Sequence, residues 1–314
     1  MLQDPGDRGE KIVEIQAPTV SESLAKTRVW LTDAFDELYK SKTALAGAVM
    51  LATLIIILFC APVLTEYNPI KPDYSAFLNP PSADHIFGTD RFGRDIFSRV
   101  LWGGRRLVMI AFAAVAFGLV LGIPVGILSG YYGGYIDALA MRVVDGLLAF
   151  PGILLYLLLV TLAREWHLEG FWNDLILVFA LGFAFSPEAA RLSRGAVLTE
   201  KHKEYVEASH NTGESDFYIA FRQIGPNCVS PLIVESTVRL GYAILIIAAL
   251  AFLGLGSAPP TPDWGADLSS ARDHMETNPY VAIFPGLAIC YTVLAFNLFG
   301  DGLRDILDPR VVER

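Results

Sequence analysis

Six stretches of this 314-residue chain are almost wholly apolar, and polar or charged segments separate them. The first, from Ala44 to Leu64, carries no charge and is long enough to cross about 30 Å of hydrocarbon as a helix. Because a backbone in lipid must satisfy its own N–H and C=O groups, each stretch is predicted to be helical. The pattern predicts an all-α polytopic membrane protein with six transmembrane helices. The other five spans are expected near residues 107–129, 144–163, 174–190, 236–256 and 280–300.

The polar segments between the spans complete the predicted domain organisation. The N-terminal tail is mixed in charge, unlike a cleavable signal, which begins with a short basic segment and an apolar stretch. Within this tail, residues 21–39 place Leu24, Trp30 and Phe35 among charges, which predicts an amphipathic elbow helix lying along the inner leaflet. The predicted units are a tail over 1–43, a first span over 44–64, a periplasmic loop over 65–106, a five-helix core over 107–303 with a cytoplasmic loop over 195–233, and a tail over 304–314.

Basic residues orient the predicted array of spans. Lys and Arg gather in the N-terminal tail, in residues 191–222 and in the C-terminal tail. Because cytoplasmic segments carry an excess of Lys and Arg, both termini and residues 195–233 are predicted to be cytoplasmic. Residues 65–106 also hold six basic residues, so the asymmetry is incomplete.

Composition removes several classes of function. The chain is 53% hydrophobic and 18% charged with a net charge of −9, which gives no sign of nucleic-acid binding. The three cysteines have no paired spacing, and the five histidines include no pair one helical turn apart, so neither a disulfide framework nor a metal site is expected. No Gly-Lys dipeptide occurs, hence no phosphate-binding loop of the G-x-x-x-x-G-K-[ST] kind. Any ATP must therefore be hydrolysed by another polypeptide, and the chain itself is not expected to be an enzyme.

Two local patterns concern packing and charge. Gly118, Gly122, Gly126 and Gly130 recur every four residues on one face of the second span, which predicts a close approach of two helix backbones.

Oppositely charged residues three or four positions apart predict ion pairs within single helices. The predicted pairs are Arg142–Asp145, Glu188–Arg191 and Glu235–Arg239, with a gating role as the alternative for the first. Trp264, in a proline-rich outer loop, is expected at the membrane interface or against a binding protein.

The cytoplasmic loop between the fourth and fifth spans is too long for a simple connector. Residues 200–211 and 215–224 read as two short helices, with Gly213 between them, Ser215 as a cap and Pro226 as a stop. The second helix is expected to place Phe217, Ala220, Phe221 and Ile224 on one face. Such a helix could lie on lipid, pack on its own bundle or insert into the groove of a partner.

Among these three alternatives, a resemblance to a known family favours insertion into the groove of a partner. The run Glu204-Tyr205-Val206-Glu207-Ala208-Ser209, followed by Gly213 and Pro226, resembles the "EAA" loop of bacterial ABC importer permeases, with Ser209 in place of an alanine. Four further segments resemble the C-subunit permeases of the dipeptide, oligopeptide and nickel importers. They are residues 85–95, 141–151, 252–265 and 297–310, and with the loop they cover the chain from about residue 40 onward in the order of the family.

This resemblance implies the fold of a type I ABC importer transmembrane domain in a bacterial inner membrane. It further implies that the loop docks onto an ATPase as a coupling helix. The implied partners are a second homologous permease, two ATP-binding cassette subunits that hold ATP and Mg, and a periplasmic binding protein; no cofactor is expected on this chain. The implied coupling residues are Glu204, Tyr205, Glu207, Ala208, Ser209, Gly213, Asp216, Phe217, Phe221 and Pro226.

The cargo and the residues that bind it do not follow from the sequence. Di- or oligopeptides are the first expectation, with nickel, opines and oligosaccharides as alternatives carried by similar permeases. Ile247 and Ala251 stand where many of these permeases have polar residues, which makes the expected pathway more apolar. Arg142, Asp145, Glu188 and Glu235 lie at the ends of predicted spans rather than at mid-membrane, so an ion-coupled secondary transporter is a weaker alternative. A membrane scaffold without transport is the third.

Overall fold

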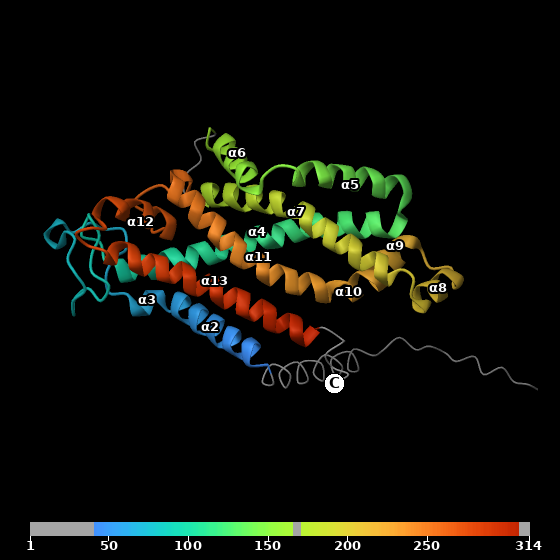
Figure 1. The fold of residues 1–314 in the computed structure, drawn as a ribbon, viewed down its shortest axis with the longest axis horizontal. Helices are drawn as coiled ribbons and strands as arrows, with labels where there is room; N and C mark the ends of the chain where they lie inside the picture. Colours follow the sequence, from blue (N-terminus) through green and yellow to red (C-terminus); the bar gives the residue numbers. More distant parts are fainter. Residues whose placement is uncertain (1–40, 166–170, 308–314) are drawn as a thin grey trace, which may run out of the picture.

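The computed structural model describes residues 41–165 and 171–307, and this part of the chain is almost entirely helical (Figure 1). Apart from a single bridge between Thr89 and Asp95, it contains no strand. Five helices are long and apolar enough to cross a membrane, the fourth of them together with the π-helical η3 (Ala251–Leu255) that continues it. They are α2 (Lys42–Phe59), α4 (Ile96–Tyr132), α7 (Phe171–Glu200), α11 (Val229–Leu250) and α13 (Tyr280–Leu307).

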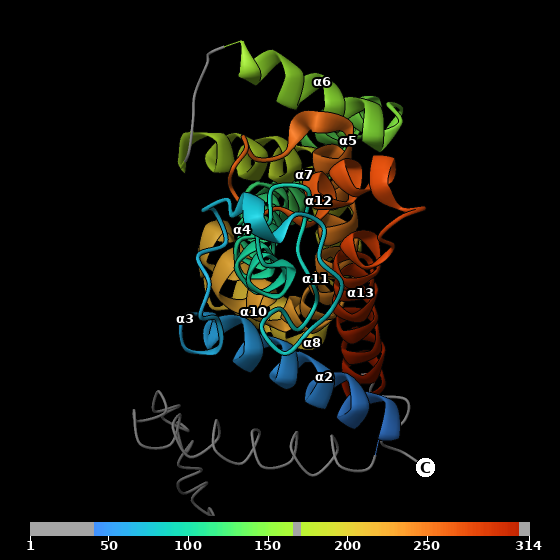
Figure 2. The ribbon, with the colours of Figure 1, turned by 90° about the vertical axis from the view of Figure 1, so that its left-hand side faces the viewer.

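The third apolar stretch is bent. It forms α5 (Gly134–Leu148) and α6 (Gly152–Arg164), which meet at an angle of 86° and together count as the sixth candidate span. Pro151, between the two helices, has no N–H to donate and disfavours helical geometry in the residue before it. The prediction of one continuous helix over 144–163 is therefore wrong. Figures 1 and 2 both show α5 and α6 along the edge of the bundle beside α7.

Several helices extend beyond the apolar stretches that predicted them. α4 begins at Ile96, so the outer loop is shorter than the predicted 65–106. Asp95 caps this helix, because its Oδ2 accepts a hydrogen bond from the Ser98 N–H at 2.7 Å. At the opposite end of the bundle, α7 continues to Glu200 and α13 to Leu307, so the tail predicted from residue 304 begins inside a helix. Hydropathy detects only the part of a helix that lies in lipid.

The glycine stripe lies against α7. A Cβ at Gly118 would be 2.9 Å from the Gly182 carbonyl oxygen, and one at Gly126 would be 2.4 Å from that of Ala190. Gly122 and Gly130 make equally close approaches to α7. Since real Cβ atoms do not come this close, only glycine allows the two backbones to approach as they do. α4 and α7 thus form one tightly packed pair along most of their length.

α2 lies on the opposite edge of the bundle from α5 and α6 (Figure 2). It packs on α13 through the backbone of Gly47, where a Cβ would be 2.3 Å from the Phe299 nitrogen. About one helical turn nearer the ends of the chain, Gly302 is equally close to Ala44. The N-terminal end of α2 and the C-terminal end of α13 therefore lie at the same end of the molecule.

The other end of the bundle is capped by short elements and loops. They are α3 (Ala61–Leu64), the single turn η1 (Tyr74–Ala76), α12 (Trp264–Ala271) and the turn η4 (Arg272–His274). Figure 1 shows this cap at the end of the bundle opposite α8 (Glu204–Asn211). The predicted elbow over residues 21–39 and the last seven residues of the chain lie outside the described part.

Candidate coupling surface

The chain between α7 and α11 folds into a compact unit at the end opposite the cap (Figure 1). It contains α8, the short α9 (Asp216–Tyr218), the π-helical η2 (Ile219–Ile224) and the single turn α10 (Gly225–Asn227). These elements and the turn at Gly213 hold all ten residues of the predicted coupling set. We call this unit, residues 201–228, the coupling unit.

Apolar side chains anchor the coupling unit to the bundle. Ile219, Ala220 and Ile224 of η2 are wholly buried, and Val206 of α8 is nearly so. With Cys228 they form one cluster that includes Ile127 of α4 and Val197 of α7. Full burial of one aliphatic side chain stabilises by about 1.5–3 kcal/mol. The cluster therefore fixes the coupling unit to the α4–α7 pair.

Hydrogen bonds add specific ties between the coupling unit and the long helices. The Tyr131 hydroxyl, at the end of α4, donates to Asp216 Oδ1 at 3.0 Å and lies 3.2 Å from His210 Nε2, so one ring connects α8 and α9 to α4. Lys201 Nζ donates to the Gly130 carbonyl at 3.0 Å. These contacts join the coupling unit to α4 at the point where the glycine stripe ends.

Glu200, the last residue of α7, gathers a second set of ties. It accepts hydrogen bonds from the Tyr205 hydroxyl at 3.0 Å and from Lys203 Nζ at 2.5 Å. The hydrogen bond to Glu200 raises the pKa of Lys203. Partial burial raises the pKa of Tyr205, and the Glu200 carboxylate adds to this effect. Both side chains therefore keep their protons at neutral pH and remain donors to Glu200.

Cys228 closes the unit where it meets α11. Its side chain is 1% exposed and belongs to the apolar cluster. Burial raises the pKa of this thiol to about 11, and the negative charge of Glu200 acts in the same direction. The thiol is therefore protonated and unreactive at neutral pH.

The turn between α8 and α9 depends on one glycine. Gly213 has φ +82°, a left-handed conformation that disfavours residues with a Cβ, and its N–H donates to the His210 carbonyl at 3.1 Å. The space around its Cα is open, so conformation rather than crowding demands glycine. Ser215 then caps α9, accepting from the Tyr218 N–H.

The outward side of the coupling unit combines acidic and aromatic groups. Glu204, Glu207 and Ala208 of α8 are exposed. Phe217 is 65% exposed, and its ring lies 4.7 Å from that of Phe221. An exposed aromatic group beside carboxylates, on a rigidly mounted turn, is typical of a surface that a partner covers.

The structure corrects the predicted amphipathic face of the second helix. The four residues expected on one face are divided: Phe217 is exposed, whereas Ala220 and Ile224 are buried together with Ile219. The reason is the π-helical winding of η2, which has more residues per turn than the α-helix assumed in the prediction. The prediction that Pro226 stops the helix is also wrong, because Pro226 lies in the first turn of α10, where a missing N–H costs little.

Predicted ion pairs are partly rearranged. Glu235 and Arg239 pair within α11 at 2.6 Å, as their spacing predicts. Asp145 pairs with Arg191 of α7 at 2.6 Å instead of with Arg142, and Glu188 pairs with Arg239 of α11 instead of with Arg191. Both corrections have one cause: local spacing cannot reveal a charge on a neighbouring helix.

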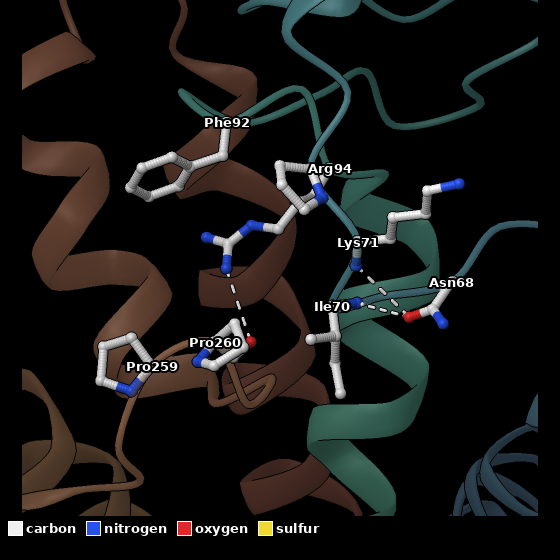
Figure 3. Close-up of a pocket in the computed structure, with 8 residues that line it drawn as sticks. Asn68, Ile70, Lys71, Phe92, Arg94, Pro259 and Pro260 are labelled. Atoms are coloured by element: carbon white, nitrogen blue, oxygen red, sulfur yellow. Dashed lines mark hydrogen bonds between the residues drawn. The ribbon is translucent and has the colours of Figure 1, made fainter.

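The outer cap is held by buried charges. Arg99 donates to Asp267 Oδ1 at 2.5 Å and to the carbonyls of Pro69 and Pro260 at 2.9 and 3.1 Å. Arg94 pairs with Asp90 at 2.6 Å and reaches the Pro260 carbonyl at 3.5 Å (Figure 3). These residues come from the loop after α3, from residues 90–99 that lead into α4, and from Pro260 and α12. The cap therefore joins the loop and the start of α4 to a segment that is 161 to 168 residues away in the sequence.

Trp264 belongs to the same cap and corrects another prediction. It is 1% exposed, and its Nε1–H donates to the Val100 carbonyl at 2.7 Å. A Cβ at Gly104 would lie 2.3 Å from its ring. Trp264 is therefore a core residue rather than a membrane-interface or docking residue.

Sequence reasoning missed two parts of the coupling unit. Tyr131 immediately follows the glycine stripe, and nothing in its local pattern predicts that it contacts both α8 and α9. The π-helical turn of η2 is likewise invisible, because the residues 219–224 fit an α-helical apolar spacing almost as well.

Two family models match this chain. The model described as "Binding-protein-dependent transport system inner membrane component" matches residues 122–313, which is more than half of the chain and includes the whole coupling unit. The chain belongs to this family. The "N-terminal TM domain of oligopeptide transport permease C" matches residues 30–81 and identifies the permease as the oligopeptide C-subunit type.

Sequence relatives support this assignment. The permease is 39% identical over 298 residues to the dipeptide transport system permease protein DppC of Alkalihalophilus pseudofirmus, covering 95% of each chain. It is 43% identical over 273 residues to the glutathione transport system permease protein GsiD of Pectobacterium atrosepticum, covering 87% of this chain and 88% of that one.

A solved structure supports the fold. The permease resembles a chain of the MetNI methionine ABC transporter in an inward-facing conformation, with a TM-score of 0.54 and 18% identity. The match covers 67% of the permease and 96% of the MetNI chain. At this identity the likeness concerns the fold alone, that of an ABC importer transmembrane domain.

The family assignment also settles the class of function. The permease is a multi-pass inner membrane protein and a non-catalytic subunit of an ABC importer. It is neither an ion-coupled secondary transporter nor a scaffold. Importers of this family work in general with a partner permease, ATPase subunits and a binding protein.

Proposed function

We propose that this permease forms half of the translocation pathway of an ATP-driven importer of short peptides, with the coupling unit as the docking site of an ATPase subunit. The observation that carries the proposal is the outward face of α8 and α9, mounted on a buried cluster that reaches both α4 and α7. In the assembly, a second homologous permease supplies the other half of the pathway. Two ATP-binding cassette subunits hold ATP and Mg, and a periplasmic binding protein delivers the cargo.

The proposed orientation places the coupling unit and both chain termini in the cytoplasm. Ala44 and Gly302, near the two ends of the described chain, lie against each other. Figure 1 shows the start of α2 and the end of α13 toward the side of the coupling unit. The Lys and Arg residues of both tails and of residues 191–222 support the same side. The cap with Arg99 and Trp264 then faces the periplasm and the binding protein.

The packing suggests how the motion of an ATPase reaches the pathway. A force on α8 passes through Val206 to the apolar cluster and from there to Ile127 and Val197. α4 and α7 respond together, because the glycine stripe leaves no room for one to slide past the other. α5 follows through the two hydrogen bonds between Arg194 and Asp137, at 2.5 and 2.6 Å. ATP binding changes the conformation only if the docked face contacts the two ATPase states differently.

Short peptides are the proposed cargo because the two relatives above are named as permeases of dipeptide and glutathione transport systems. Glutathione is itself a short peptide. Nickel, opines and oligosaccharides, the other expected cargoes, have no such support. Selectivity in the assembly rests largely on the binding protein.

Site-specific photocrosslinking tests the proposed docking. A photoreactive phenylalanine analogue at Phe217 in the complete transporter is expected to form an adduct with an ATPase subunit. The matched control is Phe77, which is 55% exposed in the outer cap and should form no such adduct. Absence of an ATPase adduct from Phe217 in the assembled complex contradicts the proposal.

A further inference from the structure

A charged groove lies between α7 and α11 and runs from Thr199 and Pro231, next to the coupling unit, to Glu188 and Arg239. Its volume is about 540 Å³. α7 contributes Glu188, Leu192 and Thr199, and α11 contributes Glu235 and Arg239. The residues recur at spacings of four and seven, so each set lies on one helix face. The groove is therefore a built feature of the two facing helices.

One arginine holds the two acidic groups of this groove. The Arg239 guanidinium contacts Glu188 across the helix interface and donates to Glu235 Oε1 at 2.6 Å. Arg239 is only 14% exposed, whereas the side chains of Glu188 and Glu235 are 44% and 36% exposed. These two carboxylates and one guanidinium leave one net negative charge, and both carboxylates are more exposed than Arg239. Arg191, at the rim, is paired with Asp145 and does not cancel this charge.

The depth of the groove shows what it faces. Glu188 lies within the apolar stretch 174–190 and Arg239 within 236–256, each near the end of its stretch that faces the coupling unit. Ionisable groups within spans face a bundle interior or a water-filled cavity, because contact with hydrocarbon costs several kcal/mol. The face of α2 contrasts with this groove, since it exposes Val49 and other apolar side chains.

Building on the proposed import of peptides, we propose that this groove lines the water-filled translocation pathway and receives the cationic amino terminus of the cargo between Glu188 and Glu235. A carboxylate has about four lone-pair positions, and contact with Arg239 uses only part of them. The remaining positions suit an ammonium group, which carries three donors on a compact charge. Arg239 acts as a positioning residue that holds the two carboxylates on either side of its guanidinium.

Thiol accessibility tests whether the groove contains water. In the complete transporter with its three native cysteines replaced by serine, Leu192→Cys is expected to react with a membrane-impermeant cationic methanethiosulfonate. The matched control is Val49→Cys, which is 56% exposed, lies at a similar distance from its helix end, and belongs to α2 on the opposite edge of the bundle from α5 and α6 (Figure 2). Equal, slow labelling at both positions would overturn the proposal.

Reagent charge and cargo protection test the recognition. The cationic reagent should modify Leu192→Cys faster than the anionic one, and this preference should fall on the order of tenfold in Glu188→Gln/Glu235→Gln. Trialanine should protect the thiol, and N-acetyl-trialanine, which lacks the ammonium group, should not. Equal protection by both peptides, or a charge preference unchanged by the double substitution, overturns the assignment.

Two measurements separate this proposal from the proposed function. The ATPase adduct from Phe217 reports docking and does not depend on the groove. If Phe217 forms the ATPase adduct but the double substitution Glu188→Gln/Glu235→Gln leaves the reagent preference unaltered, only the proposal for the groove is overturned. If the adduct is absent while the reagent preference and protection are as expected, only the docking site of the proposed function fails.

Discussion

The two ends of this permease are stabilised in different ways. At the outer cap, buried charges hold distant segments together: Arg99 is 4% exposed and binds Asp267 and two carbonyls. At the inner end, the coupling unit rests on apolar contacts and on single hydrogen bonds such as that from Tyr131 to Asp216. Buried ion pairs demand fixed geometry, whereas apolar contacts tolerate small shifts. The cap is thus built to keep its shape, and the coupling unit is built to move with α4 and α7.

The largest expected effect is at the cap. Arg99→Ala leaves Asp267 buried without its main partner, which should cost about 3–5 kcal/mol and lower the yield of folded complex. Thermal unfolding in detergent measures this loss. Arg99→Leu/Asp267→Leu, which removes both charges, should recover part of it. If Arg99→Ala leaves the unfolding temperature unchanged, the cap is not held by this pair.

The next effect is at the turn of the coupling unit. Gly213→Pro cannot adopt φ +82° and removes the N–H that donates to His210, so α8 should lose its position. Peptide uptake should disappear while the variant still inserts into the membrane and ATP hydrolysis continues uncoupled. Gly213→Asn is the control, because asparagine tolerates this conformation, and it should retain most uptake. Normal uptake by Gly213→Pro would contradict the role of the turn.

A smaller effect is expected between the two ends. Gly122→Ala places a Cβ 2.4 Å from the Ser186 carbonyl oxygen and should cost about 1–3 kcal/mol by forcing α4 and α7 apart. Gly195→Ala meets no atom within 4 Å and should be neutral or slightly stabilising. Thermal unfolding of both variants checks this, and equal stability would show that the stripe does not require glycine.

The smallest effect concerns Cys228. Its pKa is raised from 9.0 to about 11, so the folded state holds its proton more tightly than the unfolded state. This contribution to stability is complete below pH 9 and is lost as the pH rises toward 11. With Cys60 and Cys290 replaced, alkylation of Cys228 should therefore keep accelerating above pH 9.5, where an ordinary thiol has already reached its plateau. A plateau already reached by about pH 9.5 would show that the thiol is not buried.

Much of the fold could be predicted from the sequence because lipid imposes a simple rule. An apolar stretch long enough to cross a membrane must be a helix, so all six stretches were predicted near their observed positions. The bend at Pro151 was missed because average hydropathy does not register a single missing N–H. The cap was missed because its central pair, Arg99 and Asp267, is separated by 168 residues.

The candidate site was predictable to a different degree. The end of α8 and the turn at Gly213 follow from local sequence, since a left-handed glycine is a local effect, whereas α8 begins at Glu204 rather than at the predicted residue 200. The burial of Ile219 and the separation of Phe217 from the buried Ile224 do not follow, because a π-helical turn depends on the cluster formed with Ile127 and Val197. Nor does local sequence reveal that Glu188 meets Arg239 on another helix.

Matched charge reversals at the two ends test the central claim that the coupling unit transmits ATPase motion. Glu207 and Glu276 are both exposed acidic residues, the first on α8 and the second in the outer cap. The measurement is the amount of peptide imported per ATP hydrolysed in proteoliposomes that contain the complete transporter and its binding protein. Glu207→Arg should reduce this ratio to near zero with the assembly intact, and Glu276→Arg should leave the ratio unchanged. An unchanged ratio in Glu207→Arg would contradict the claim.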